Sequence, residues 1–94
     1  MKTVYIDTKQ ISSVQLLQDF LRQELNCPSY YGGNLDALYD VLTTIHEDTE
    51  IYISKYENSQ DKSFNRYMER FLRVLHDAEM QNAYLTVIID KTGI

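Results

Sequence analysis

The chain has 94 residues, 14 acidic and 9 basic side chains, a formal net charge of −5 and one cysteine. This length fits a single domain over residues 1–94, and the acidity argues against nucleic acid or an anionic membrane as partner, because both are polyanions. Cys27 cannot form an internal disulfide, no apolar run approaches the roughly 20 residues that span a bilayer, and Asp7 comes too early for a secretory signal, so we expect a cytoplasmic protein.

Strand-like and helix-like segments alternate along the chain. The predicted elements are, in order, a strand at Thr3–Asp7, a helix capped by Ser12 with Gln15 that ends near Asn26, a helix from Asn34 to about Thr44, a strand at Thr49–Lys55, a long helix with an apolar stripe from Phe64 to Ala78, and a strand at Tyr84–Ile89. The last segment is almost continuously apolar, which predicts a strand buried on both faces. The order β-α-α-β-α-β predicts an α/β fold, a small three-stranded parallel sheet flanked by helices.

The negative charge is concentrated in the middle of the chain. Between Arg22 and Lys55 there are six acids and no lysine or arginine, so this segment carries −6, and the remaining nine bases and eight acids give +1. Such a distribution favours a surface of one sign that attracts a basic partner. It also fits a solvated acidic surface that only aids solubility.

The helix that begins at Asn34 carries the residues of greatest interest. Asp36, Asp40 and Thr43 share the side opposite its leucines, and two carboxylates four residues apart repel each other by a few tenths of a kcal/mol. The pair could bind Mg²⁺ or Ca²⁺ if further ligands were present, or face a basic neighbour from the third helix. An anion at the helix start is disfavoured by Asp36. The remaining possibility is a protein-binding surface that enters a partner's cationic cleft.

A run of residues here resembles the central motif of the barstar family of ribonuclease inhibitors. The matching positions are Pro28, Tyr30-Tyr31-Gly32, Asn34-Leu35-Asp36-Ala37-Leu38, Asp40, Leu42 and Thr43. The resemblance extends more loosely over nearly the whole chain and implies a three-stranded parallel sheet flanked by helices. It also implies a protein that is not an enzyme and has no catalytic residue, metal or cofactor, but that binds one-to-one to a basic, barnase-like ribonuclease of the secreted guanyl type.

The resemblance also assigns roles to individual residues. The positions it places at the nuclease interface are Tyr30, Tyr31, Gly32, Asn34, Asp36, Asp40, Thr43, Ile45 and Asp77. Asp40 would occupy the site where the nuclease holds an RNA phosphate, with Asp36 and Thr43 in the same cleft. The two tyrosines and Gly32 would pack against the rim and a catalytic histidine, and Asn34 would form the junction between loop and helix.

Three positions depart from the family pattern. Ile45 stands where barstar has an aromatic residue, Asp77 is one methylene shorter than the acid expected there, and Gln81 replaces a second acid. We therefore expect a nuclease related to barnase rather than barnase itself. Two alternatives remain at this point: an immunity or regulatory module whose basic protein partner is not a ribonuclease, and a metal-dependent enzyme centred on Asp36 and Asp40.

Overall fold

The computed structural model describes residues 1–29 and 31–90. Its elements are, in chain order, β1 (Lys2–Ile6), the short 3-10 helix η1 (Thr8–Gln10), α1 (Val14–Glu24), α2 (Leu35–Thr43), β2 (Thr49–Ile53), α3 (Lys62–Gln81) and β3 (Leu85–Ile89). The predicted α/β fold and the order β-α-α-β-α-β are confirmed. None of the helices in this part of the chain is long and apolar enough to cross a membrane.

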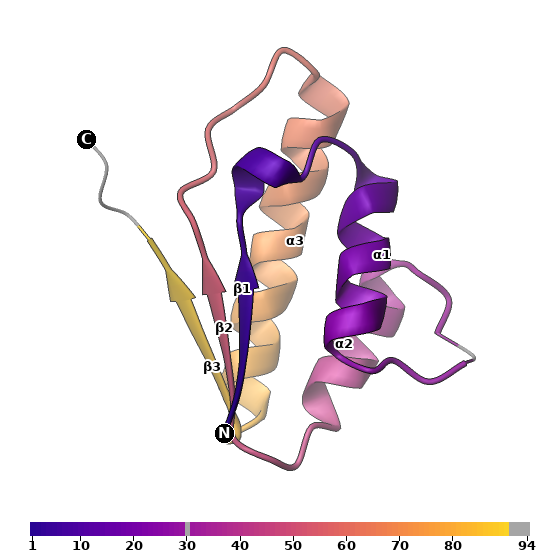
Figure 1. Cartoon of the computed structure of the whole chain (residues 1–94), viewed down its shortest axis with the longest axis vertical. Helices are drawn as coiled ribbons and strands as arrows, with labels where there is room; N and C mark the ends of the chain where they lie inside the picture. The colour runs from indigo at the N-terminus through magenta and orange to yellow at the C-terminus, as the bar shows by residue number, and fades with distance from the viewer. Residues whose placement is uncertain (30, 91–94) are drawn as a thin grey trace.

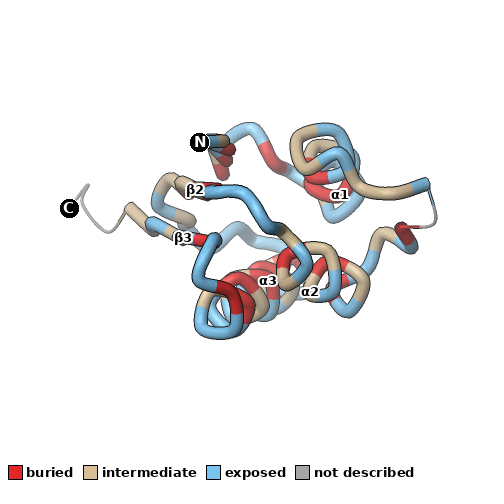
Figure 2. The backbone as a smooth tube through the Cα atoms, turned by 90° about the horizontal axis from the view of Figure 1, so that it is seen from below, coloured by how far each residue is buried: buried red, intermediate tan, exposed pale blue. Residues whose placement is uncertain are grey.

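The three strands form one parallel sheet in the order β1-β2-β3. Val4 lies opposite Ile51, and Ile51 lies opposite Val87. The strands run up the view of Figure 1 and the helices run down it. Right-handed crossovers between successive parallel strands place the helices on one face of the sheet, and the second view shows this two-layer arrangement (Figure 2).

The hydrophobic core lies between the sheet and the helical layer. The largest fully buried side chains come from β1, β2 and the three α-helices and are Val4, Ile6, Leu17, Leu21, Leu38, Leu42, Ile51, Ile53, Met68, Phe71 and Leu75. Burying one side chain of this size contributes about 1.5–3 kcal/mol. The same contacts fix α2, which packs on α3, while α3 packs on β3.

The prediction that the last strand is buried on both faces is wrong. Leu85 is buried towards the helices, but Thr86 and Ile88 are exposed on the other side. The reason is that helices cover only one face of the sheet. On the open face Tyr5 stacks on Tyr52, with ring centroids 5.3 Å apart, and Ile88 lies next to Tyr52 in register.

Side-chain caps set the starts of the helices. Asn34 caps α2 as predicted, since its Oδ1 accepts an N–H bond of 2.8 Å from the first turn. For α1 the predicted cap is wrong by one residue: Ser13, not Ser12, accepts the N–H of Leu16 at 3.2 Å. Gln15 then points along the helix and donates to the next turn instead of closing a capping box.

Candidate protein-binding surface

The acidic surface of α2, formed by Asp36 and Asp40, has no basic partner among the residues that the structure describes. Asp36 and Asp40 are both exposed, one helical turn apart. Among the residues that the structure describes, neither carboxylate has a hydrogen bond or an ion pair to another side chain, so α3 does not supply the basic neighbour considered above. Thr43 lies half-buried one turn further on, and its hydroxyl donates to the carbonyl of Tyr39 at 2.9 Å.

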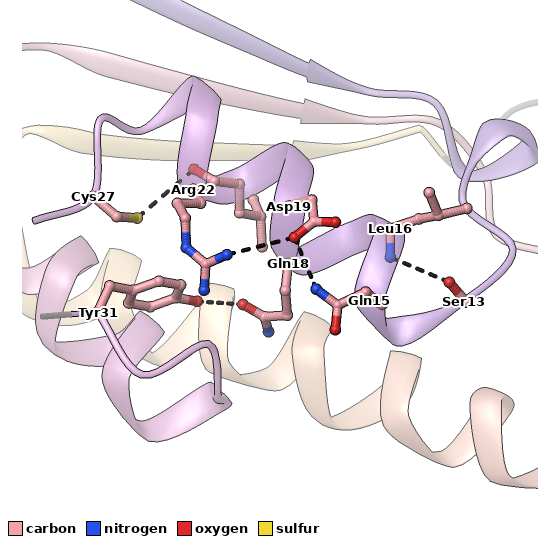
Figure 3. Close-up of polar contacts among 9 residues, drawn as sticks. Ser13, Gln15, Leu16, Gln18, Asp19, Arg22, Cys27 and Tyr31 are labelled. Atoms are coloured by element: carbon pink, nitrogen blue, oxygen red, sulfur yellow. Dashed lines mark hydrogen bonds and ion pairs between the residues drawn. The ribbon is translucent and has the colours of Figure 1, made fainter. Parts of the chain in front are cut away.

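The loop before α2 is held to α1 by a buried chain of hydrogen bonds. Tyr31 is only 7% exposed, and its hydroxyl donates to Oε1 of Gln18 (Figure 3). Nε2 of Gln18, a residue 3% exposed, donates to the hydroxyl of Tyr67 on α3 at 2.6 Å. The Tyr31 ring therefore points into the molecule and orders the loop. Tyr30, the other predicted aromatic contact, lies outside the described residues.

Arg22 fixes the same loop from above the Tyr31 ring. Its guanidinium lies 5.6 Å from the ring centroid and pairs with Asp19 at 3.5 Å (Figure 3). Gly33 has a φ of +71°, and a Cβ atom there would lie 3.2 Å from a guanidinium nitrogen of Arg22. A side chain at this position would strain the backbone and push against the Arg22 guanidinium, so glycine suits it best. A surface ordered before binding loses less conformational entropy when the partner arrives.

The side chains of Cys27 and Tyr31 are held in their neutral forms. Burial, assisted by the neighbouring Cys27 and Tyr67, raises the pKa of Tyr31 to about 12, and Arg22 opposes this only in part. Burial also raises the pKa of the Cys27 thiol, which donates to the carbonyl of Leu21 at 3.7 Å. A thiol with a raised pKa is a poor nucleophile at neutral pH. Cys27 is thus a half-buried side chain beside Pro28 with a structural role.

A cavity of about 800 Å³ opens between this loop, α2 and the first residues of β1 and β2. Four of the predicted interface residues line it, namely Tyr31, Gly32, Asp40 and Ile45. Four further predicted residues in the described part of the chain do not line it: Asn34 caps α2, Asp36 and Thr43 lie elsewhere on that helix, and Asp77 is exposed on α3. The structure therefore gathers four of these eight residues around the cavity and spreads the other four along α2 and α3.

Two residues that contribute to this surface, Gln18 and Glu47, are not predicted from the sequence. Gln18 sits on the apolar stripe of α1, one position after Leu17, and a polar residue in such a stripe signals a buried hydrogen bond. Glu47 lines the cavity beside Ile45 but follows the end of α2, so no helical spacing links it to Asp40. In residues 1–29 and 31–90, no three histidine, cysteine, aspartate or glutamate side chains are grouped so as to hold a metal ion.

Fold and surface together describe a small α/β protein with an ordered, acidic helical surface. The family model described as "Barstar (barnase inhibitor)" matches residues 1–89. The chain therefore belongs to the barstar family, as its central motif indicated. It is also similar to the Bacillus subtilis (strain 168) protein named "Putative ribonuclease inhibitor YrdF", with 30% identity over 79 residues that cover 84% of this chain and 87% of the relative.

Proposed function

We propose that this protein is a stoichiometric inhibitor of a secreted guanyl-type ribonuclease related to barnase, acting in the cytoplasm of the cell that makes the nuclease. The family model and the name of the Bacillus subtilis relative support a ribonuclease as partner. The observation that carries the proposal is the exposed pair Asp36 and Asp40 on α2, without an internal basic partner among the described residues. A ribonuclease offers the matching surface, since it binds RNA phosphates with arginine and lysine.

In the proposed complex α2 blocks the active-site cleft. Asp40 takes the place of an RNA phosphate, and Asp36 and Thr43 lie in the same cleft. The loop of Tyr30, Tyr31 and Gly32 covers the rim, while the positions at the periphery are Asn34, Ile45 and Asp77. Complementary fields accelerate the encounter, and charge pairs removed from water at the centre slow dissociation. Inhibition then follows from competition with RNA and needs no chemistry from the inhibitor.

The direct test is a titration of the purified protein into a panel of small guanyl-type ribonucleases while RNA cleavage is followed. We expect activity to fall linearly to an end point at one inhibitor per enzyme. We also expect slower association at higher salt, because exposed charges are screened. No inhibition at micromolar excess across the panel would refute the proposal and would favour a basic partner of another class.

A matched pair of variants tests the role of Asp40. Asp40→Asn removes one negative charge from α2, and Glu57→Gln removes one from an exposed position elsewhere. Because a hydrogen bond to a charged group contributes about 1.5–3 kcal/mol, Asp40→Asn should weaken binding roughly 10- to 150-fold. Glu57→Gln should change affinity by less than about twofold, and both variants should unfold within about 0.5 kcal/mol of the parent. Equal losses of affinity would show that only net charge matters.

A further inference from the structure

The cavity beside α2 has an apolar wall that the proposed contacts of Asp36 and Asp40 do not use. Ala37, Val41 and Ile45 line it at intervals of four residues along and just beyond α2. Leu25 and Pro28 line it from the end of α1 and the start of the loop. All five side chains are half-buried, so part of their apolar surface still meets water. Covering this surface would be favourable by roughly 25 cal/mol per Å².

The electrostatic surroundings of the cavity favour a cation. Asp40 and Glu47 line it, both exposed, and neither has a side-chain partner in the described part of the chain. The C-terminal ends of α1 and α2 lie at the same end of the molecule as the first residues of the strands (Figure 1), and the residues after both helices contribute to the lining. A helix C-terminus carries a partial negative charge, which α2 leaves unopposed because its last turn has no basic residue.

The side chains of Arg22 and Lys2 leave this negative potential largely unopposed, and a third basic side chain, His46, lines the cavity with its Nδ1 3.5 Å from the carbonyl oxygen of Thr44. Arg22, in the last turn of α1, is already engaged with Asp19 and with the Tyr31 ring. Lys2 lines the cavity, but its ammonium makes no ion pair with Asp40 or Glu47 in the described residues. Both carboxylates are therefore available to a cation supplied by a partner.

The occupant must suit both the wall and the charges. A purely apolar side chain would desolvate the carboxylates without pairing them, and an anion would be repelled. A long aliphatic stem that ends in a cation satisfies both, because the stem covers the apolar wall while the head reaches the acids. We propose that the cavity receives one arginine or lysine side chain from the partner nuclease, with its charged end between Asp40 and Glu47.

This inference rests on the proposed function, since the cavity shares Tyr31, Gly32 and Asp40 with the surface assigned to the nuclease. A partner seated on α2 thus lies over the opening of the cavity. The site would also select among nucleases: only one with a suitably placed basic side chain could fill it. Glu47 and the wall residue Ala37 are its specificity-determining positions.

The first experiment asks whether the cavity accepts such a group, with n-butylguanidinium as the probe and uncharged n-butylurea as its control. In a ¹⁵N–¹H NMR titration of the whole protein, we expect saturable shifts of the amides of Val41 and of residues 44–47 with the cation at millimolar concentrations. Butylurea should give much smaller shifts. Equal responses to the two probes, or shifts spread evenly over the protein, would overturn the proposed chemistry of the occupant.

The second experiment asks whether the nuclease uses the cavity. Glu47→Gln should weaken binding of an inhibited nuclease about two- to fivefold, as for a partly exposed ion pair. Ala37→Leu fills the cavity without a helix penalty and should weaken binding about tenfold or more. Their matched controls, Glu57→Gln and the exposed Ala83→Leu, should bind as the parent does.

The two proposals fail in different ways. If no nuclease of the panel is inhibited, the proposed function falls, and the butylguanidinium titration alone then decides whether the cavity takes a stemmed cation. If a nuclease is inhibited but binds Glu47→Gln and Ala37→Leu as tightly as the two controls, the proposed function stands and the occupancy of the cavity is refuted.

Discussion

The hydroxyl of Tyr31 is the point at which the loop before α2 can be loosened with the smallest change. It donates to Oε1 of Gln18, which is 3% exposed and has no other donor in the described residues. Tyr31→Phe keeps the buried ring but leaves this oxygen without a partner. An unsatisfied buried acceptor costs about 1–3 kcal/mol. At about 4–8 °C per kcal/mol for a domain of this size, we expect the melting temperature to fall by roughly 10 °C.

Thermal and urea unfolding, followed by circular dichroism at 222 nm, measure this loss. The matched control is Tyr5→Phe, which removes a hydroxyl from a side chain that is 54% exposed and should change stability by less than about 0.5 kcal/mol. If Tyr31→Phe and Tyr5→Phe unfold at the same urea concentration, the buried hydrogen-bond chain does not hold the loop, and it does not order the binding surface before the partner arrives.

Three further predictions concern Tyr31, the cap of α2 and the contact between α3 and β3. The pKa of Tyr31 rises from 10.0 to about 12 on folding, so between these pH values the unfolded chain has lost a proton that the folded protein retains. The free energy of unfolding should therefore fall as the pH rises from 10 to 12. Urea titrations should show a smaller fall for Tyr31→Phe. Asn34→Ala should cost about 1 kcal/mol through loss of the α2 cap, whereas Asn34→Ser should retain most of it in the same unfolding assay. Glu79→Ala should cost about 1.5–3 kcal/mol, because Oε2 of Glu79 accepts the Val87 N–H at 2.6 Å. This N–H lies on β3, an edge strand of the sheet, and without Glu79 it is free to pair with another molecule. The variant should therefore show concentration-dependent association in sedimentation velocity, with Glu69→Ala as the unaffected control.

These outcomes can each be contradicted. A pH dependence between 10 and 12 that is identical in Tyr31→Phe and the parent would place the titration on another tyrosine. Equal stabilities of Asn34→Ala and Asn34→Ser would show that the side-chain cap does not stabilise α2. A monomeric Glu79→Ala variant would show that other features protect the edge of the sheet.

Local patterns in the sequence were sufficient for the elements and for the acidic helix. Helical spacing and Asn34 located α2, and the alternation of strands and helices predicted the parallel sheet. Asp36 and Asp40 lie exposed on α2, as a helix with its leucines inward requires. These features depend on neighbours within about four residues, which sequence patterns report directly.

Features that depend on distant residues were not predictable in the same way. Tyr30 and Tyr31 look equivalent in the sequence, and only the position of Gln18, 13 residues before Tyr31, turns the Tyr31 ring inward. The apolar run of β3 resembles a strand covered on both faces, yet the number of helical layers decides this, and Ile88 remains exposed. The cavity combines Lys2, Asp40 and Glu47 from separate segments, so no single stretch of sequence predicts it.

The one-sided covering of the sheet separates the molecule into two surfaces that can change independently. The residues on the open face, around Tyr5, Tyr52 and Ile88, are divided from α2 by the sheet and the helical core. Substitutions there can accumulate, or a label or surface tether can be attached there, without disturbing the acidic helix. A lineage of such proteins can in this way keep its binding surface matched to one target while its opposite face adapts to other demands.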